Sequence, residues 1–256
     1  MPGLFHSLET DGIYLRELID SEQIMQIFIN PPKNKKMECA IMLVTGLFCL
    51  VGLGSNMSGK ETSETMASAG SMDRKIAITF DDGPNPDYTE MLLEGLKERG
   101  VRATFFLLGK EVEMYPEIVE DIYEDGHLIG THSYEHVNLK NLSDAAAIEQ
   151  VDKTNAAIYE ITSEYPEYIR PPFGCWKCNL DYETEMIEVL WDVDPLDWKT
   201  SNSDVITKRV VDKVQENDII LLHDASESSV MAAFKIIDQL QKEGYTFVTV
   251  DEILFD

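Results

Sequence analysis

The sequence predicts an α/β protein whose strands form a parallel sheet, either open or closed into a barrel. From Lys75 onward, short apolar runs alternate with stretches in which apolar residues recur at helical spacing, and the connections between them are short. This alternation is typical of a parallel sheet. Hydrophobic residues make up 44% of the 256-residue chain, which is enough for the packed core of one ordinary domain. No internal repeat is visible.

The individual elements follow from local patterns. Ile76, Ile78 and Phe80 alternate as in a buried strand, and Gly100 is a usual helix stop. The expected strands are residues 75–80, 103–109, 127–133, 189–194, 218–224 and 246–250, with the segment 168–174 between the third and fourth. The expected helices are residues 88–100, a helix ending at Gly126, a long helix from Ser143 to about Ser163, and helices beginning at Ser203 and Ser228.

The first 73 residues are predicted to lie outside this domain. Within residues 37–56, fifteen consecutive residues carry no charge, and lysines precede them. This pattern is typical of a signal peptide or a signal-anchor, with a buried core helix as the alternative. Residues 57–73 are rich in Ser, Thr and Gly and indicate a flexible tether. We therefore expect residues 74–256 to be extracellular or at the cell surface, either secreted or held at the membrane through residues 37–56.

Residues 1–36 are unusual ahead of such a segment, because signal peptides begin at the terminus. They are either a cytoplasmic amphipathic piece or are not translated, if translation starts at Met25.

Charge and cysteine content limit the function further. The formal net charge of −26 argues against a nucleic-acid partner, because such binding depends on basic patches. Cys39 and Cys49 lie in or beside the apolar segment, whereas Cys175 and Cys178 form a C-x-x-C motif. That motif is compatible with a redox pair, half a zinc site, a strained disulfide or two idle thiols.

Charged residues gather at the predicted carboxyl ends of the strands, where parallel sheets and barrels place their active sites. Three of the five histidines of the chain are among these residues. In chain order the set is Asp81 and Asp82, His132 and His136, Arg170, Asp192 and Asp194, and His223.

The spacing within this set indicates a metal site. His132 and His136 are four residues apart, so one helical turn would direct both imidazoles the same way. Two imidazoles and one carboxylate leave open positions on a divalent ion, as a catalytic metal requires. Asp82 is the natural carboxylate. Its neighbour Asp81 then stays free as a general base, and the cation makes two adjacent carboxylates tolerable.

Five segments in this order resemble the motifs of the polysaccharide deacetylases, the NodB-homology or family 4 carbohydrate esterases. They are TFDDGP, HSYEH, RPPFG, DPLDW and LLHD, and the resemblance covers residues 75–256, about seventy per cent of the chain. It implies a distorted, partly open (β/α) barrel that removes acetyl groups from glycans with one divalent ion, expected to be zinc, with cobalt or another divalent ion as alternatives.

The resemblance also implies roles for individual residues. Asp82, His132 and His136 look like the metal ligands, and Asp81 looks like the general base oriented by Arg170. His223 looks like the general acid, with Asp194 as its charge partner. The backbone N–H of Phe173 would stabilise the oxyanion, Leu221 would face the acetyl methyl group, and Trp198 would wall the groove.

Three features depart from the family pattern. Phe173 stands where Tyr is usual, which removes a hydroxyl but keeps the backbone donor. Cys175 and Cys178 follow where polar loop residues are usual. The stretch between Gly174 and Trp191 is shorter than expected, which puts the helix after the third motif in doubt.

The expected substrate is a glycan polymer, bound by a protein that we expect to be a monomer. The motif WDVDPLDWK together with the export signal and tether resembles bacterial peptidoglycan N-acetylglucosamine deacetylases. A secreted acetylxylan esterase or chitin deacetylase is the alternative. A catalytically silent glycan-binding barrel is the alternative of another class.

Overall fold

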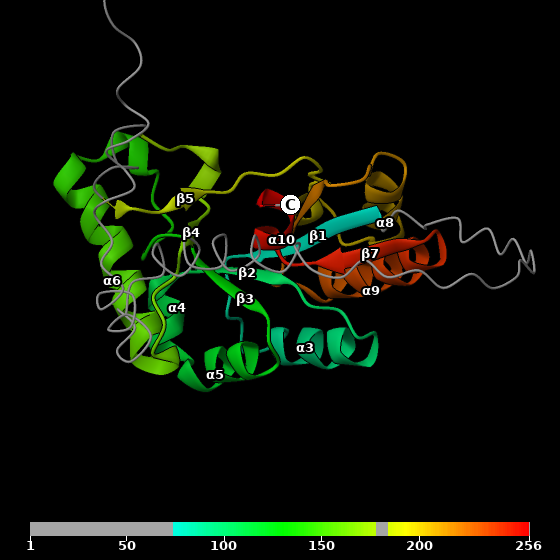
Figure 1. Ribbon diagram of the computed structural model, residues 1–256, viewed down its shortest axis with the longest axis horizontal. Coiled ribbons are helices and arrows are strands. Elements are labelled where there is room, and N and C mark those ends of the chain that lie inside the picture. Colours follow the sequence, from blue (N-terminus) through cyan, green and yellow to red (C-terminus); the bar gives the residue numbers. More distant parts are fainter. Residues whose placement is uncertain (1–73, 178–183, 256) are drawn as a thin grey trace, which may run out of the picture. The chain divides into compact units, whose positions relative to one another are not determined.

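The computed structural model describes residues 74–177 and 184–255, which form a sheet of parallel strands flanked by helices (Figure 1). The strands are β1 (Arg74–Asp81), β2 (Thr104–Leu107), β3 (Leu128–Thr131), β4 (Tyr168–Ile169), β5 (Ile187–Glu188), β6 (Ile219–His223) and β7 (Tyr245–Val248). The α-helices are α3 (Thr89–Glu98), α4 (Gly109–Met114), α5 (Pro116–Glu124), α6 (Asp144–Thr162), α8 (Ser203–Val211), α9 (Glu227–Lys242) and α10 (Val250–Leu254). Short 3₁₀ turns cover Leu139–Asn141, Pro172–Gly174 and Asp197–Lys199.

The sheet is a distorted, partly open barrel, as expected. All of its pairings are parallel, and the strand order is β5-β4-β3-β2-β1-β6, with β7 also paired to β1. On β1, Arg74 to Ala77 pair with β7, whereas Thr79 to Asp81 pair with β2. One edge of this long strand is therefore shared by two neighbours. Val193 bridges to Ile220, so the chain beyond β5 returns to the free edge of β6 and partly closes the barrel.

Alternation along β1 separates the core into an outer and an inner part. Ile76, Ile78 and Phe80 belong to the large apolar cluster that includes buried residues of the helices, whereas Ala77 belongs to a smaller cluster with Phe106 and Val250. Since successive side chains of a strand point to opposite faces, Thr79 and Asp81 share the inner face with Ala77. All three are buried. The barrel interior below the site is therefore partly polar, which the apolar pattern of the strand did not indicate.

Several predicted elements differ in detail from the observed ones. The helix expected to end at Gly126 is two helices, α4 and α5, because Pro116 lacks the N–H needed to continue α4. The strand expected at residues 189–194 is reduced to the bridge at Val193, and the regular pairing lies earlier, in β5. Asp192 accepts a hydrogen bond from Ile219 N (2.9 Å), so it lies at the amino end of β6 rather than at the carboxyl end. Helix α10 was not predicted.

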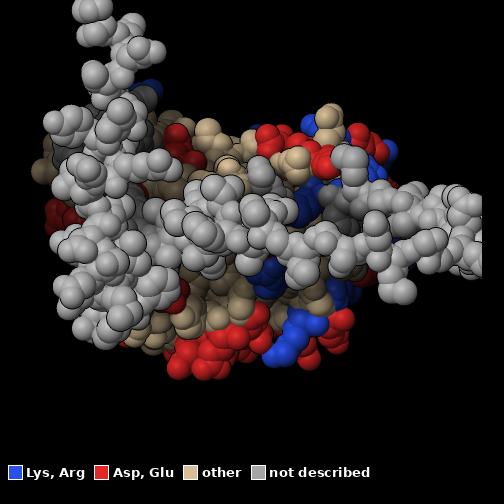
Figure 2. Space-filling model, viewed as in Figure 1, with Lys and Arg blue, Asp and Glu red and all other residues tan. Residues whose placement is uncertain are grey.

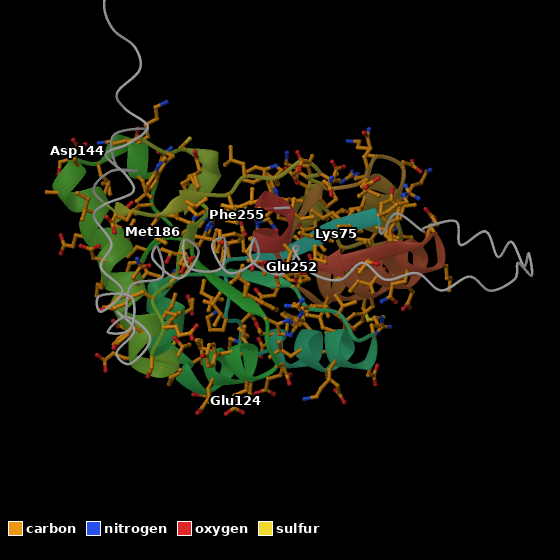
Figure 3. The ribbon with its side chains drawn as sticks, in the orientation of Figure 1. Lys75, Glu124, Asp144, Met186, Glu252 and Phe255 are labelled. Atoms are coloured by element: carbon orange, nitrogen blue, oxygen red, sulfur yellow. The ribbon has the colours of Figure 1, made fainter. Side chains whose placement is uncertain are left out.

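Acidic side chains form several patches on the visible surface. In Figure 2, Asp and Glu gather along the edge formed by α3 and α5, and in Figure 3 Glu124 of α5 points away from the sheet. This distribution agrees with solvated helix faces as the source of the negative charge.

The predictions for the N-terminal part lie outside the described residues: the segment 1–36, the signal peptide or signal-anchor at 37–56, and the tether at 57–73. Within 74–177 and 184–255, no helix combines the length and the apolar character needed to cross a membrane.

Candidate active site

The strand register brings the predicted residues together at the carboxyl end of the sheet. Asp81 ends β1 and lies directly opposite His223, the last residue of β6. His132 follows the last residue of β3, and Arg170 follows the last residue of β4. Parallel strands end at the same edge, so residues from four separate motifs meet there.

A cavity of about 480 Å³ opens at this edge. Of the ten residues to which the sequence analysis gives a role in catalysis, metal binding or substrate binding, nine line it, and Arg170 is the exception because it lies buried beneath. The lining consists of Asp81, Asp82, His132, His136, Phe173, Trp191, Asp194, Trp198, Leu221, His223 and Ala225. Trp191 and Ala225 are additions that the sequence did not single out.

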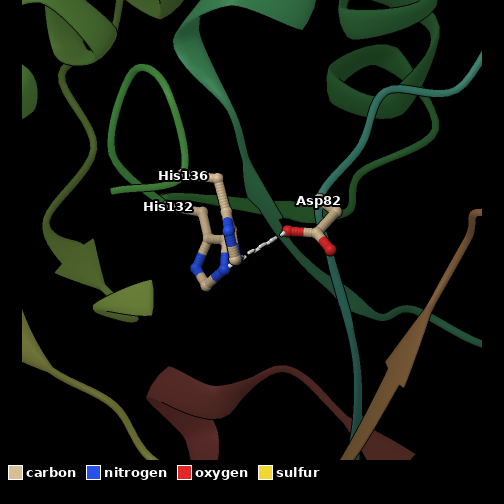
Figure 4. Close-up of side chains that lie close together, drawn as sticks. All are labelled: Asp82, His132 and His136. Atoms are coloured by element: carbon tan, nitrogen blue, oxygen red, sulfur yellow. Dashed lines mark ion pairs between the residues drawn. The ribbon is translucent and has the colours of Figure 1, made fainter. Parts of the chain in front are cut away.

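Asp82, His132 and His136 point toward one another (Figure 4). The Nε2 atoms of both histidines lie 3.4 Å from the same oxygen, Asp82 Oδ1. One ligand atom from each residue falls within 4.8 Å of the others, which is a cluster suited to a single ion. The ligand atoms of the three predicted residues therefore converge on one site.

The hydrogen bonds around Asp82, His132 and His136 leave a site that is suited to a cation. His132 Nδ1 lies 2.6 Å from the carbonyl oxygen of Arg170, which can only accept, so Nδ1 carries the proton and Nε2 presents its lone pair to Asp82. Burial lowers the pKa of His132, against the opposing charges of Asp81 and Asp82. Asp82 Oδ1 is buried and has no hydrogen-bond partner among the described residues. Acceptors that face one another in this way are satisfied by a metal ion.

The predicted helical turn between the two histidines is wrong. Residues 132–136 form a loop in which Ser133 has φ 66° and His136 has φ 56°, both in the left-handed region. Backbone N–H groups of Tyr134 and Glu135 donate to Gln150 Oε1 (3.2 and 2.9 Å) and fasten this loop to α6. The two imidazoles converge because of loop geometry rather than helical spacing.

The loop after β1 turns Asp82 away from Asp81. Asp82 has φ 75°, a strained value for a residue with a side chain. The next residue has to be glycine, because a Cβ on Gly83 would lie 2.6 Å from Oδ2 of the buried Asp224. Thr89 donates a short hydrogen bond to that same oxygen. The Gly that follows the paired aspartates is thus required by packing.

Arg170 is fully buried, and its guanidinium connects the inner wall of the barrel to Asp81. Nη1 donates to Asp81 Oδ1 (2.8 Å) and to Thr79 Oγ1 (2.6 Å). Nε donates to the carbonyl of Val189 (3.1 Å), and Nη2 donates to the carbonyl of Leu190 (3.0 Å). The plane of the guanidinium also lies over the Phe106 ring, 4.2 Å from its centroid. This is the arrangement predicted for a cation that orients Asp81.

The structure corrects the predicted partner of His223. His223 Nδ1 lies 2.8 Å from Asp197 Oδ1, whereas Asp194 accepts from the backbone N–H of Leu196 (2.7 Å). Asp197 is 1% exposed and begins a 3₁₀ turn directly beneath β6, whereas Asp194 remains on the cavity wall. Both aspartates belong to the DPLDW motif, and the sequence alone did not indicate which one faces inward.

This pairing sets the protonation of both groups. Although burial alone would raise the pKa of Asp197, hydrogen bonds from His223 and Ser229 hold it below its usual range. Burial opposes the charged form of His223 as well, yet the hydrogen bond and charge of Asp197 raise the pKa of His223 to about 9. His223 is therefore a protonated imidazole at neutral pH, as a general acid requires.

The apolar residues form the open part of the cavity. Phe173 and Trp198 are each 63% exposed, whereas Leu221 is buried. Phe173 has φ 61° and places its ring edge-on to His136, with 4.8 Å between the centroids. Trp191 packs beneath this loop, since a Cβ on Gly174 would be 3.4 Å from its ring. The Phe173 and Trp198 rings thus form an exposed aromatic part of the cavity wall.

The C-x-x-C motif is only partly described. Cys175 Sγ lies 3.5 Å from the carbonyl of Phe173, whereas Cys178 lies outside the described residues, as do Cys39 and Cys49. The state of the pair, and the helix placed in doubt after Gly174, therefore stay predictions.

Comparison with known proteins supports the motif assignment. The family profile for polysaccharide deacetylases matches residues 69–189. PdaC of Bacillus subtilis, a peptidoglycan-N-acetylmuramic acid deacetylase, is 40% identical over 178 residues, which cover 70% of this chain. PgdA of Listeria monocytogenes, a peptidoglycan-N-acetylglucosamine deacetylase, is 32% identical over 238 residues, which cover 93% of this chain. The chain spans only 38% of the length of PdaC and 50% of the length of PgdA.

Solved structures share the fold. The structure of PdaC has a TM-score of 0.70 and 39% identity, and the match covers 72% of this chain and 91% of that chain. BA3943 of Bacillus anthracis, a CE4 family pseudoenzyme, has a TM-score of 0.67 and 30% identity over 72% of this chain and 66% of its own.

The buried ion pair below the site leads to a first prediction. Replacing Arg170 by Met should lower the free energy of unfolding by about 3–5 kcal/mol, because Asp81 would remain buried without its cation. Arg102→Met is the matched control, since the salt bridge of Arg102 to Glu252 is half exposed and should contribute about 1 kcal/mol or less. Urea unfolding of both variants measures the difference. Equal losses would show that the buried pair has no special role.

Proposed function

The chain belongs to the polysaccharide deacetylase family, and from that premise we propose that it is a metal-dependent hydrolase of N-acetylglucosamine units in a cell-wall glycan, peptidoglycan in particular. One observation carries the proposal: two adjacent carboxylates face different partners. Asp81 is paired with Arg170, whereas Asp82 faces two imidazoles. Adjacent groups in different environments can take different catalytic roles.

Asp82, His132 and His136 would hold a divalent ion, and zinc is the expected one because the donors are two nitrogens and one oxygen with room for further ligands. When bound, such an ion would polarise an acetyl carbonyl and bring the pKa of water toward ~7. The chain itself supplies the proton transfers. Asp81 Oδ2 does not bond Arg170, so this oxygen is available to accept a proton from the attacking water.

The leaving amine needs a proton of its own, and His223 is placed to supply it. Its ring lines the same cavity as Asp81, on the neighbouring strand end. An amine leaves a tetrahedral intermediate only after protonation, so an amide substrate requires both a base and a separate acid. The backbone N–H of Phe173 would contribute to binding of the oxyanion. Leu221 would contact the acetyl methyl group and Trp198 would contact the sugar.

The substrate proposal rests on the named relatives, PdaC and PgdA, which are deacetylases of N-acetylmuramic acid and N-acetylglucosamine units of peptidoglycan respectively. Side-by-side measurement of acetate release from peptidoglycan, chitin oligomers and acetylated xylan tests it, with the position of the new amine identified by mass spectrometry. Release from xylan alone would support a secreted acetylxylan esterase, and release from chitin alone a chitin deacetylase. Because peptidoglycan lies outside the membrane, the proposal also requires export, through residues 37–56.

A catalytically silent glycan-binding barrel is the second candidate, favoured by the similarity to the pseudoenzyme BA3943. It accounts less well for this chain, because the base, the three ligand residues and the acid are all present and converge on one cavity.

A second prediction concerns the ligands. His132→Ala and His136→Ala should each lower zinc content and activity strongly while circular dichroism shows a folded barrel, since each removes one of three donors. His127→Ala is the control, because His127 is a buried histidine at the opposite end of β3. Full zinc content by mass spectrometry in His132→Ala would contradict the ligand assignment.

A third prediction separates the two aspartates. Asp81→Asn should keep zinc but lose nearly all turnover, because the proton acceptor is gone while the ligand set stays intact. Asp82→Asn should lose zinc. If Asp81→Asn lost zinc to the same degree as Asp82→Asn, the two roles would be reversed.

A fourth prediction uses the difference between amide and ester. A phenolate leaves without protonation, so His223→Ala should reduce deacetylation of N-acetylglucosamine oligomers roughly 10²–10⁴-fold more than hydrolysis of an activated aryl acetate. Asp197→Asn should show the same selectivity in weaker form, and Asp194→Asn should not. Equal losses on both substrates would assign His223 to water activation or to binding.

A fifth prediction is that the pKa of His223 sets an alkaline limit on amide hydrolysis. Because Asp197 raises the pKa of His223 to about 9, amide hydrolysis should decline as pH rises through about 9, where the imidazolium loses its proton. In Asp197→Asn the decline should begin at lower pH, since the charge that raises the pKa is removed. An unchanged alkaline limb in this variant would contradict the pairing.

A further inference from the structure

Ser229, a buried residue in the first turn of α9, contacts Asp197, the partner of the proposed general acid His223. Its hydroxyl donates to Asp197 Oδ2 at 2.7 Å, and its side chain is 2% exposed. We propose that Ser229 is a positioning residue that fixes the Asp197 carboxylate, and through it the His223 imidazole, for proton transfer to the leaving amine. The inference rests on the proposed deacetylase function and adds a residue that none of the five sequence motifs contains.

The hydrogen bonds of Asp197 carry the argument. Oδ1 faces His223 Nδ1 at 2.8 Å, whereas Oδ2 accepts from the backbone N–H of His223 (2.9 Å) and from Ser229. Both bonds of His223 reach the carboxylate from β6, so the hydroxyl of Ser229 is the contact that comes from another element. Without it, Oδ2 keeps one donor, and His223 alone holds the carboxylate through one hydrogen bond to each oxygen.

The hydroxyl of Ser229 is not needed to cap its own helix. Ser226 is the N-cap of α9, and its Oγ accepts from the backbone N–H of Ser229 (3.2 Å). Ser226 Oγ in turn donates to Ser229 Oγ (3.0 Å), so two hydroxyls form a chain that ends on the carboxylate. Consecutive hydrogen bonds of this kind strengthen one another.

The helix that carries Ser229 makes the contact rigid and electrostatically favourable. Val230, Ala233 and Ile237 of α9 are fully buried in the main core, so the first turn cannot shift freely. The amino end of a helix also favours a negative charge within its first turn. Both effects hold Asp197 ionised and in one orientation.

The test compares amide with ester hydrolysis in the zinc-loaded full chain. Ser229→Ala should reduce deacetylation of N-acetylglucosamine oligomers about tenfold more than hydrolysis of an activated aryl acetate, a fraction of the roughly 10²–10⁴-fold that a positioned acid contributes. Ser228→Ala is the matched control, because Ser228 bonds Ser226 but does not touch Asp197. Ser229→Thr keeps the hydroxyl and should restore the ratio. Equal losses on amide and ester in Ser229→Ala would overturn the proposal.

A second readout is independent of the substrate. The Nδ1–H proton of His223, observed by NMR, should exchange with water faster in Ser229→Ala than in the parent chain or in Ser228→Ala. A chain that releases no acetate from any glycan would refute the proposed function, yet faster exchange in Ser229→Ala would still support the positioning role. Unchanged exchange would refute that role whether or not the chain is a deacetylase.

Discussion

The ion pair between Arg170 and Asp81 is the interaction on which the site depends. A guanidinium with no exposed surface is costly inside a protein unless every donor is used. Here Nε, Nη1 and Nη2 all have acceptors, supplied by Thr79, Asp81 and the carbonyls of Val189 and Leu190. The backbone carbonyl of Arg170 accepts a hydrogen bond from His132 Nδ1–H. One residue thus orients the proposed base with its side chain and a proposed metal ligand with its main chain.

The same pair explains how two aspartates can stand next to each other. Strand alternation puts Asp81 on the inner face of β1, where the guanidinium neutralises it. The left-handed turn at Asp82 then directs the second carboxylate toward the two histidines. Gly83 permits this turn because the buried Asp224 leaves no room for a side chain behind it. The separation of roles is therefore set by backbone conformation and by packing beneath the loop.

Much of this arrangement could be predicted from the sequence, because strand ends are readable from apolar runs that stop at charged residues. Asp81, His132, Arg170 and His223 were placed correctly on that basis. The partner of His223 could not be predicted in the same way. Asp194 and Asp197 share one irregular segment without periodicity, and the inward residue is decided by Leu196, whose left-handed conformation (φ 55°) begins the turn that buries Asp197.

Other differences have related causes. The strand predicted at residues 189–194 contains the apolar residues of a strand, but the carbonyls of Val189 and Leu190 are occupied by Arg170 instead of a neighbouring strand. In this part of the sheet, hydrogen bonds to the buried Arg170 side chain thus take the place of regular strand pairing. The gap that results between β5 and β6 leaves the barrel partly open. The predicted helical turn at His132–His136 is wrong because a loop, which is hydrogen-bonded to α6, brings the two imidazoles together without helical spacing.

The proposed base and the proposed acid are held by different parts of the fold. Asp81 is fixed from within the barrel by Arg170, whereas His223 is fixed from the outer layer by Asp197 and the first turn of α9. Their backbones are nevertheless direct neighbours, because β1 and β6 pair in register at these two residues. The base must be ionised while the acid is protonated. Arg170 provides the counter-charge of Asp81, and Asp197 raises the pKa of His223 to about 9, which keeps the proposed acid protonated at neutral pH. Each group thus has its own buried counter-charge, while the pairing of β1 with β6 keeps their backbones adjacent.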